Sequence, residues 1–223
     1  MYKTLLTATL ALGITGMTAL STKASTLIFA DNFNQENNGV RALNYSSFNN
    51  WDVTNGSVDL YGRASNGFGS LLVRTNGAFV DLDGSTGTAG TLTSKQTFTF
   101  NPGDILTLQY DLSPGARPNT SFGNNILIVS LGDIYRTVHA TGVGFPLKTP
   151  FKSFSTTIHV TERTRGNLVF SHLGGDTQGI YLDNVRLSVE KAVVPEPLTI
   201  LGAGTAIAFG AGFKRKLGKA NKK

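Results

Sequence analysis

NPGDILTLQYDL, at residues 101–112, carries the clearest structural signal in the chain. Leucine or tyrosine occupies every even position from 106 to 112, and Ile, Thr, Gln and Asp occupy the odd positions between them. This period of two is typical of a β-strand that buries one face. The Pro102-Gly103 pair before it favours a turn, because proline fixes φ and glycine tolerates positive φ. The stretch therefore predicts a strand over 105–112 that is entered from a tight turn.

Similar short runs, either alternating or continuously apolar, fill the rest of the chain between its two terminal segments. The expected strands are 26–29, 57–61, 70–74, 78–82, 92–100, 105–112, 125–131, 135–140, 151–160, 167–172 and 180–189. Clusters of glycine, asparagine and proline separate them, and no segment between 25 and 194 keeps a helical period. About eleven short strands between turns favour two packed sheets. We expect an all-β fold, a jelly-roll β-sandwich.

The N-terminal segment has the composition of a secretory signal peptide. Lys3 precedes an uncharged run from Thr4 to Thr22, and small residues around Lys23 fit a cut between Ala24 and Ser25. Residues 1–24 are therefore expected to form a signal-peptide helix that is removed on export. The alternative is an uncleaved N-terminal anchor.

The C-terminal segment, residues 193–223, has three parts. Pro195-Glu196-Pro197 leads into 16 uncharged residues, Leu198–Phe213, and six basic residues follow. As a helix the uncharged run is about 24 Å long, against a hydrocarbon core of about 30 Å. It can span if the lysines extend toward the headgroups. The basic cluster predicts a cytoplasmic C-terminus for this transmembrane helix.

These three parts, in this order, resemble the PEP-CTERM sorting signal of bacterial exported proteins. The resemblance implies processing by an exosortase-type membrane protease, with Pro195, Glu196 and Pro197 as the sorting motif. The two prolines also disfavour helix at Val194 and Glu196, which leaves an extended segment of the kind that proteases bind. The alternative is a plain single-pass anchor.

The chain's basic balance comes from its two ends. They hold eight of the 20 basic and one of the 14 acidic residues, so residues 25–194 carry 12 and 13, a net charge of −1. Nucleic acid is therefore not an expected partner, since such binding needs clustered Lys and Arg. Cysteine is absent, which excludes disulfides and thiolate sites. Residues 25–192 have ordinary size for one domain.

A second resemblance concerns the first and last expected strands. Ala30-Asp31-Asn32-Phe33 and the segment 179–187, GIYLDNVRL, look like the opening and closing strands of carbohydrate-binding jelly-roll modules. The resemblance implies a structural calcium ion held by Asp31 and Asp183. Carboxylate oxygens are suitable ligands for calcium, which would tie the two chain ends together. The alternative for each is an aspartate facing solvent at a strand end.

The sequence contains few of the motifs that are typical of enzymes. His139, His159 and His172 all fall within expected strands, and none follows a nucleophile motif. The segment 81–85, DLDGS, lacks the later ligands of an EF-hand loop, so turns made by aspartate side chains explain it better. We expect no enzymatic activity, although an exported hydrolase with paired carboxylates stays an alternative.

Ligand binding is the remaining class of function. Trp51 and Tyr61 are candidates for stacking on sugar rings, and the expected loops 115–125 and 142–150 hold side chains that can bind hydroxyls. An anchor in the core or at the rim of the sandwich is the favoured alternative for Trp51, since aromatic residues in a β-sandwich are mostly in the core. The sequence thus favours an exported cell-surface or matrix protein that binds exopolysaccharide. A structural or adhesive matrix protein without a specific ligand is the main alternative.

Overall fold

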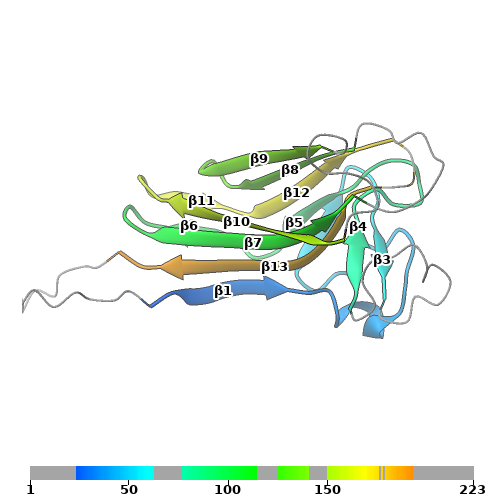
Figure 1. The fold of residues 1–223 in the computed structure, drawn as a ribbon, viewed down its shortest axis with the longest axis horizontal. Coiled ribbons are helices and arrows are strands. Elements are labelled where there is room, and N and C mark those ends of the chain that lie inside the picture. The colour runs from blue at the N-terminus through cyan, green and yellow to red at the C-terminus, as the bar shows by residue number, and fades with distance from the viewer. Residues whose placement is uncertain are drawn as a thin grey trace, which may run out of the picture.

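The computed structural model describes residues 24–62, 77–114, 125–140, 150–175, 177 and 179–192, and they are almost entirely β-structure (Figure 1). The expected signal-peptide helix, the sorting tail and the strand at 70–74 lie outside these residues. The elements are β1 Thr26–Asp31, the 3-10 helix η1 Glu36–Gly39, β2 Trp51–Thr54, β3 Asp59–Tyr61, β4 Phe79–Asp81, β5 Thr91–Ser94, β6 Phe98–Phe100, β7 Ile105–Ser113, β8 Ile126–Leu131, β9 Tyr135–Ala140, β10 Lys152–His159, β11 Thr164–Gly166, β12 Leu168–Leu173 and β13 Tyr181–Glu190.

The first sheet is built around the long strand β13. Its order is β10-β7-β13-β4-β3, and β1 pairs with β13 beside β4. The start of β13 pairs with β4, whereas β1 pairs with residues 185–189. All these pairs are antiparallel. Strands β1, β13, β7 and β10 therefore form one broad surface, which Figure 1 shows as four neighbouring ribbons.

The second sheet has the order β2-β5-β12-β8-β9, and β6 pairs with β11 in a separate two-stranded ribbon. Leu108 and Leu187 of the first sheet and Val129 and Phe170 of the second are fully buried in one hydrophobic cluster. Alternation along each strand turns every second side chain into this cluster. The expected all-β class with two packed sheets is confirmed.

The segment 92–100, expected as one strand, forms two. Ser94 ends β5, where its Oγ accepts a hydrogen bond from the N–H of Leu168 at 3.0 Å. The Asn167 side chain also donates to the carbonyl of Ser94 at 2.6 Å. Beyond this point the chain leaves β12 and pairs with β11 instead. Hydrogen bonds from residues far away in the sequence therefore end β5 at Ser94. The pattern of residues 92–100 alone gives no sign of this break.

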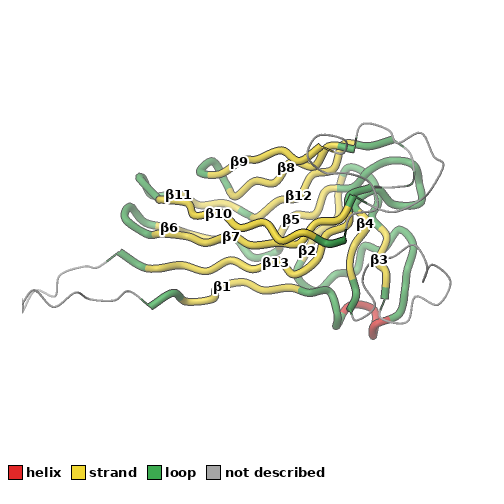
Figure 2. The backbone as a smooth tube through the Cα atoms, viewed as in Figure 1, coloured by secondary structure: helices red, strands yellow, loops and turns green. Residues whose placement is uncertain are grey.

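The two ends of the described chain emerge at the same end of the sandwich (Figure 2). Thr26 pairs with Val189 in the ladder between β1 and β13. The Asn101–Asp104 turn holds the C-terminal end, because Asp104 accepts hydrogen bonds from Lys191 Nζ and the N–H of Ala192, each at 3.0 Å. No helix among the described residues is long and apolar enough to cross a membrane.

Candidate functional site

A β-bulge interrupts the centre of the first sheet. Asp183 pairs with Asp111 of β7, but the next paired residue, Arg186, faces Gln109, so β13 has one extra residue here. Asn184, within the bulge, has φ +51°, and its side chain donates to Asp111 Oδ2 at 2.7 Å. Bulges bend a strand and redirect side chains. This one lies directly before Arg186 on the outer face of the sheet.

A row of four exposed side chains crosses this face in register. Ser155 of β10 pairs with Gln109, Gln109 pairs with Arg186, and Arg186 pairs with Ala30 of β1. Paired residues of antiparallel strands point to the same face, here the one opposite the core. Three gaps of about 4.8 Å make the row about 15 Å long.

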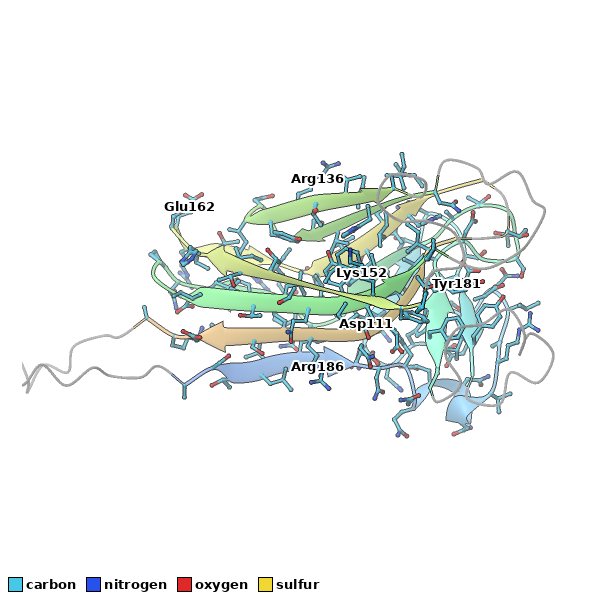
Figure 3. The ribbon with its side chains drawn as sticks, in the orientation of Figure 1. Asp111, Arg136, Lys152, Glu162, Tyr181 and Arg186 are labelled. Carbon is cyan, nitrogen blue, oxygen red and sulfur yellow. The ribbon has the colours of Figure 1, made fainter. Side chains whose placement is uncertain are left out.

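Two adjoining hollows lie along this row, with volumes of about 260 and 230 Å³. Asn184 and Arg186 line both, so the hollows form one continuous surface, here called the polar groove. The first hollow also has Gln109, Tyr110, Asp111, Ser153, Phe154 and Ser155; the second also has Ala30, Asp31, Asn32, Gln35, Glu36, Asn49, Asn50 and Val185. Figure 3 labels Asp111 and Arg186 on the strands that carry the groove.

Asp31 connects the groove to the core. Its Oδ2 accepts hydrogen bonds from Trp51 Nε1 at 2.9 Å and from Asn50 Nδ2 at 3.0 Å. Its Oδ1 accepts one from the N–H of Phe33 at 2.8 Å. Phe33 is fully buried with φ +55°, an unusual conformation for a bulky residue. The carboxylate thus fixes both the indole and the strained backbone that shapes this end of the groove.

Glu36 is almost fully buried at the same end. Both carboxylate oxygens accept from the N–H of Asn49, at 3.0 and 3.2 Å. Burial is the largest influence on the pKa of Glu36 and raises it; the hydrogen bond from Asn49 opposes this but does not cancel it. Glu36 therefore positions the loop at Asn49 and presents little charge to solvent.

Neither Trp51 nor Tyr61 offers a ring face to a ligand. Trp51 is 0% exposed, and edge-on contacts at 5.3 Å to Phe29 and 5.7 Å to Phe170 place it in the core. Tyr61 is 3% exposed and stacks on Phe79 at 5.1 Å. The alternative of Trp51 as a core anchor is confirmed, and both candidates for sugar stacking are corrected by their burial.

Asp31 and Asp183, the residues expected to share a calcium ion, lie on the neighbouring strands β1 and β13 and have different pairing partners. Asp31 pairs with Val185, which is in the core, whereas Asp183 pairs with Asp111 on the outer face. The structure does not test whether one ion is held by both carboxylates, so the calcium ion stays a prediction. Melting curves in calcium and in chelator test it. A melting temperature that rises in calcium, and no longer rises in Asp183→Ala, would support the calcium site.

The segment 81–85 forms the turn expected of it. Asp81 Oδ1 accepts a hydrogen bond from the N–H of Asp83 at 3.1 Å, which is an Asx turn. Across the described residues, no three His, Asp or Glu side chains are grouped so that they could hold a metal ion. His139, His159 and His172 lie in β9, β10 and β12, as their sequence patterns predict.

Apart from Asp31, which was expected to bind calcium, sequence reasoning did not identify the groove residues as a site. Gln109, Asp111 and Arg186 were expected to face outward, because each alternates with apolar neighbours. What brings them together is the pairing of β7 with β13 and the extra residue in the bulge. The asparagine at 184, which tolerates positive φ, is the one local signal that could have indicated the bulge.

No protein-family model matches the chain, and no curated protein matches it. Similar solved structures include a Clostridium thermocellum xylanase fragment with a CBM22 and a GH10 module, at 12% identity and TM-score 0.43 over 77% of this chain and 30% of that one. A xylan-binding CBM22 domain of Paenibacillus barcinonensis matches 78% of this chain and 100% of its own, at 10% identity and TM-score 0.41. An adhesin domain of the Porphyromonas gingivalis Lys-gingipain matches 73% and 99%, at 13% identity and TM-score 0.38. At these scores the likenesses do not bear on function.

Proposed function

We propose that this is an exported protein whose β-sandwich binds polysaccharide in the polar groove. The observation that carries the proposal is the groove itself: two hollows that share Asn184 and Arg186 and extend across four strands. A long, open and polar surface suits an extended chain of sugars better than a small enclosed ligand.

The groove has the chemistry that sugar hydroxyls need. A hydroxyl both donates and accepts, so it is matched by amides, hydroxyls and carboxylates placed together. Gln109, Ser155 and Asn50 supply such groups along the groove. The two aromatic residues of the lining offer little stacking area, since Tyr110 is 2% exposed and Phe154, its register partner, packs against the core. Affinity for one short glycan should therefore be modest, and a polymer gains from repeated contacts.

Export and sorting complete the proposal and are based on the sequence. Residues 1–24 would direct secretion, and residues 193–223 would hold the precursor in the membrane until an exosortase-type protease cleaves near Pro195-Glu196-Pro197. The mature protein would then lie at the cell surface or in the extracellular matrix. Binding without turnover is the activity that we propose for it.

Affinity electrophoresis of the full chain in detergent, through gels that contain different polysaccharides, tests the binding. Gln109→Ala should reduce retardation several-fold, because this exposed side chain lines the groove. Thr157→Ala is the matched control: it changes an exposed residue of β10 that does not line either hollow. Equal retardation of both variants would refute the groove, and no retardation in any gel would favour a structural protein without a ligand.

A further inference from the structure

Arg186 carries the groove's available positive charge. Its side chain is exposed at the point where the two hollows meet. Across the described part of the chain, no carboxylate lies within ion-pair distance of its guanidinium. Its register partner on β1 is Ala30, whose methyl group leaves that side of the guanidinium open. Arg186 is thus a cation with free hydrogen-bond donors directed at the groove.

The carboxylates of the groove are bound by the protein itself. Asp31 accepts three hydrogen bonds, from Phe33, Asn50 and Trp51. Asp111 accepts from Ser153 Oγ at 2.6 Å and from Asn184 Nδ2 at 2.7 Å. Glu36 accepts from Asn49 and is 2% exposed. The oxygens of these acids are occupied by protein donors and fix the walls of the groove, which leaves Arg186 as the cation of the lining that can bind a ligand.

We propose that the groove selects polysaccharides containing uronic acids, with Arg186 binding the sugar carboxylate. This inference rests on the proposed function and names its substrate class. A guanidinium presents two parallel N–H donors that match the two oxygens of a carboxylate, and such charge-assisted pairs are stronger than neutral hydrogen bonds. The hydroxyls of the adjoining sugars meet Gln109 and Ser155, which follow Arg186 along the same row.

The fork geometry matters as well as the charge. Lysine would supply a compact point charge without two donors in one plane, so Arg186→Lys should keep electrostatic attraction and lose the paired hydrogen bonds. Arg186→Gln should lose both. The affinity for a uronate polymer should therefore fall in the order Arg, Lys, Gln at position 186.

Isothermal titration of the full chain in detergent compares polygalacturonate with the same polymer after reduction of its carboxyl groups to alcohols. The acidic polymer should bind about tenfold more tightly, the scale of one good charge-assisted pair. Arg186→Gln should remove this preference, and Arg186→Lys should reduce it. Arg136→Gln is the matched control, because Arg136 is an exposed arginine on β9 of the other sheet, as Figure 3 shows, and should leave the preference intact.

Other results of this titration would each overturn one part of the proposal. Equal binding of the two polymers would refute uronate selection and leave polysaccharide binding standing. Loss of the preference in Arg136→Gln as well would show that overall charge, not Arg186, causes it. A sulfated glycan binding as tightly as polygalacturonate would overturn the carboxylate assignment. If neither polymer binds, uronate selection fails, and the affinity electrophoresis decides separately whether the protein binds any polysaccharide.

Discussion

Replacing Asp104 tests the contact that closes the sandwich at the end from which the tail emerges. Its carboxylate is 2% exposed and accepts hydrogen bonds from the N–H groups of Asn101 and Ala192 and from Lys191 Nζ, all at 3.0 Å. Hydrogen bonds to a charged acceptor contribute about 1.5 to 3 kcal/mol each, and Lys191 adds little because its side chain is 57% exposed. Counting the two backbone bonds, Asp104→Ala should lower the free energy of unfolding by about 3 kcal/mol.

The same contact predicts the sign of a pH dependence. Burial acts to raise the pKa of Asp104, but the hydrogen bonds from Asn101 and Ala192 and the nearby Lys191 outweigh it, so the pKa is lowered in the folded protein. A lowered folded pKa contributes stability above the unfolded value of about 4, and this is lost as pH falls through the folded pKa. The stability difference between Asp104→Ala and the unmodified protein should therefore shrink in acid.

Urea unfolding at pH 7 and at pH 3 measures both effects. Asp133→Ala, an exposed aspartate after β8, is the control and should change stability by less than about 0.5 kcal/mol. If Asp104→Ala is as mild as this control at pH 7, the turn does not hold the C-terminal end. If its effect is the same at both pH values, the ionised carboxylate is not the cause.

Three further predictions concern packing, a buried acid and the tail. Gly166→Ala should destabilise by about 2 kcal/mol, because its Cβ would clash with the Cα of Gly132. Gly175→Ala, with nothing within 4 Å of the added Cβ, should be nearly neutral in urea unfolding. Burial raises the pKa of Asp81 well above its usual range in the folded protein, so stability is lost as pH rises above the pKa that Asp81 has in the unfolded chain. Asp81→Asn, which cannot ionise, should therefore melt at a higher temperature than the unmodified protein at pH 7. A lower melting temperature would contradict this. Replacing residues 195–197 by three alanines should preserve membrane insertion and block C-terminal trimming; mass spectrometry of the unmodified mature protein should find residue 223 absent, and its presence would leave a plain anchor.

The strands were predictable where alternation is strong. The pattern over 105–112 matched β7 closely, because a half-buried strand places a polar residue at every second position. Strand β2, Trp51–Thr54, was not expected, since only four residues pair and their pattern is too short to stand out. Its position depends on β5, with which it pairs. Sequence patterns thus indicate which face of a long strand is buried, whereas the position of a short strand depends on the strand that it pairs with.

The site was less predictable than the fold. Aromatic residues drew attention as sugar platforms, yet Trp51 and Tyr61 are buried, because large rings stabilise a sandwich that has no disulfides. The groove is instead made of ordinary outward polar residues, Gln109 and Arg186 among them. Such residues look alike on every strand until the register places them side by side.

Mapping the binding surface by amide chemical shifts during titration with an oligogalacturonate tests the central claim most directly. The largest shifts should fall on Gln109, Asn184 and Arg186 and on their neighbours in β1, with the second sheet little changed. Shifts centred on β8 and β9 would contradict the assignment of the polar groove as the polysaccharide-binding site.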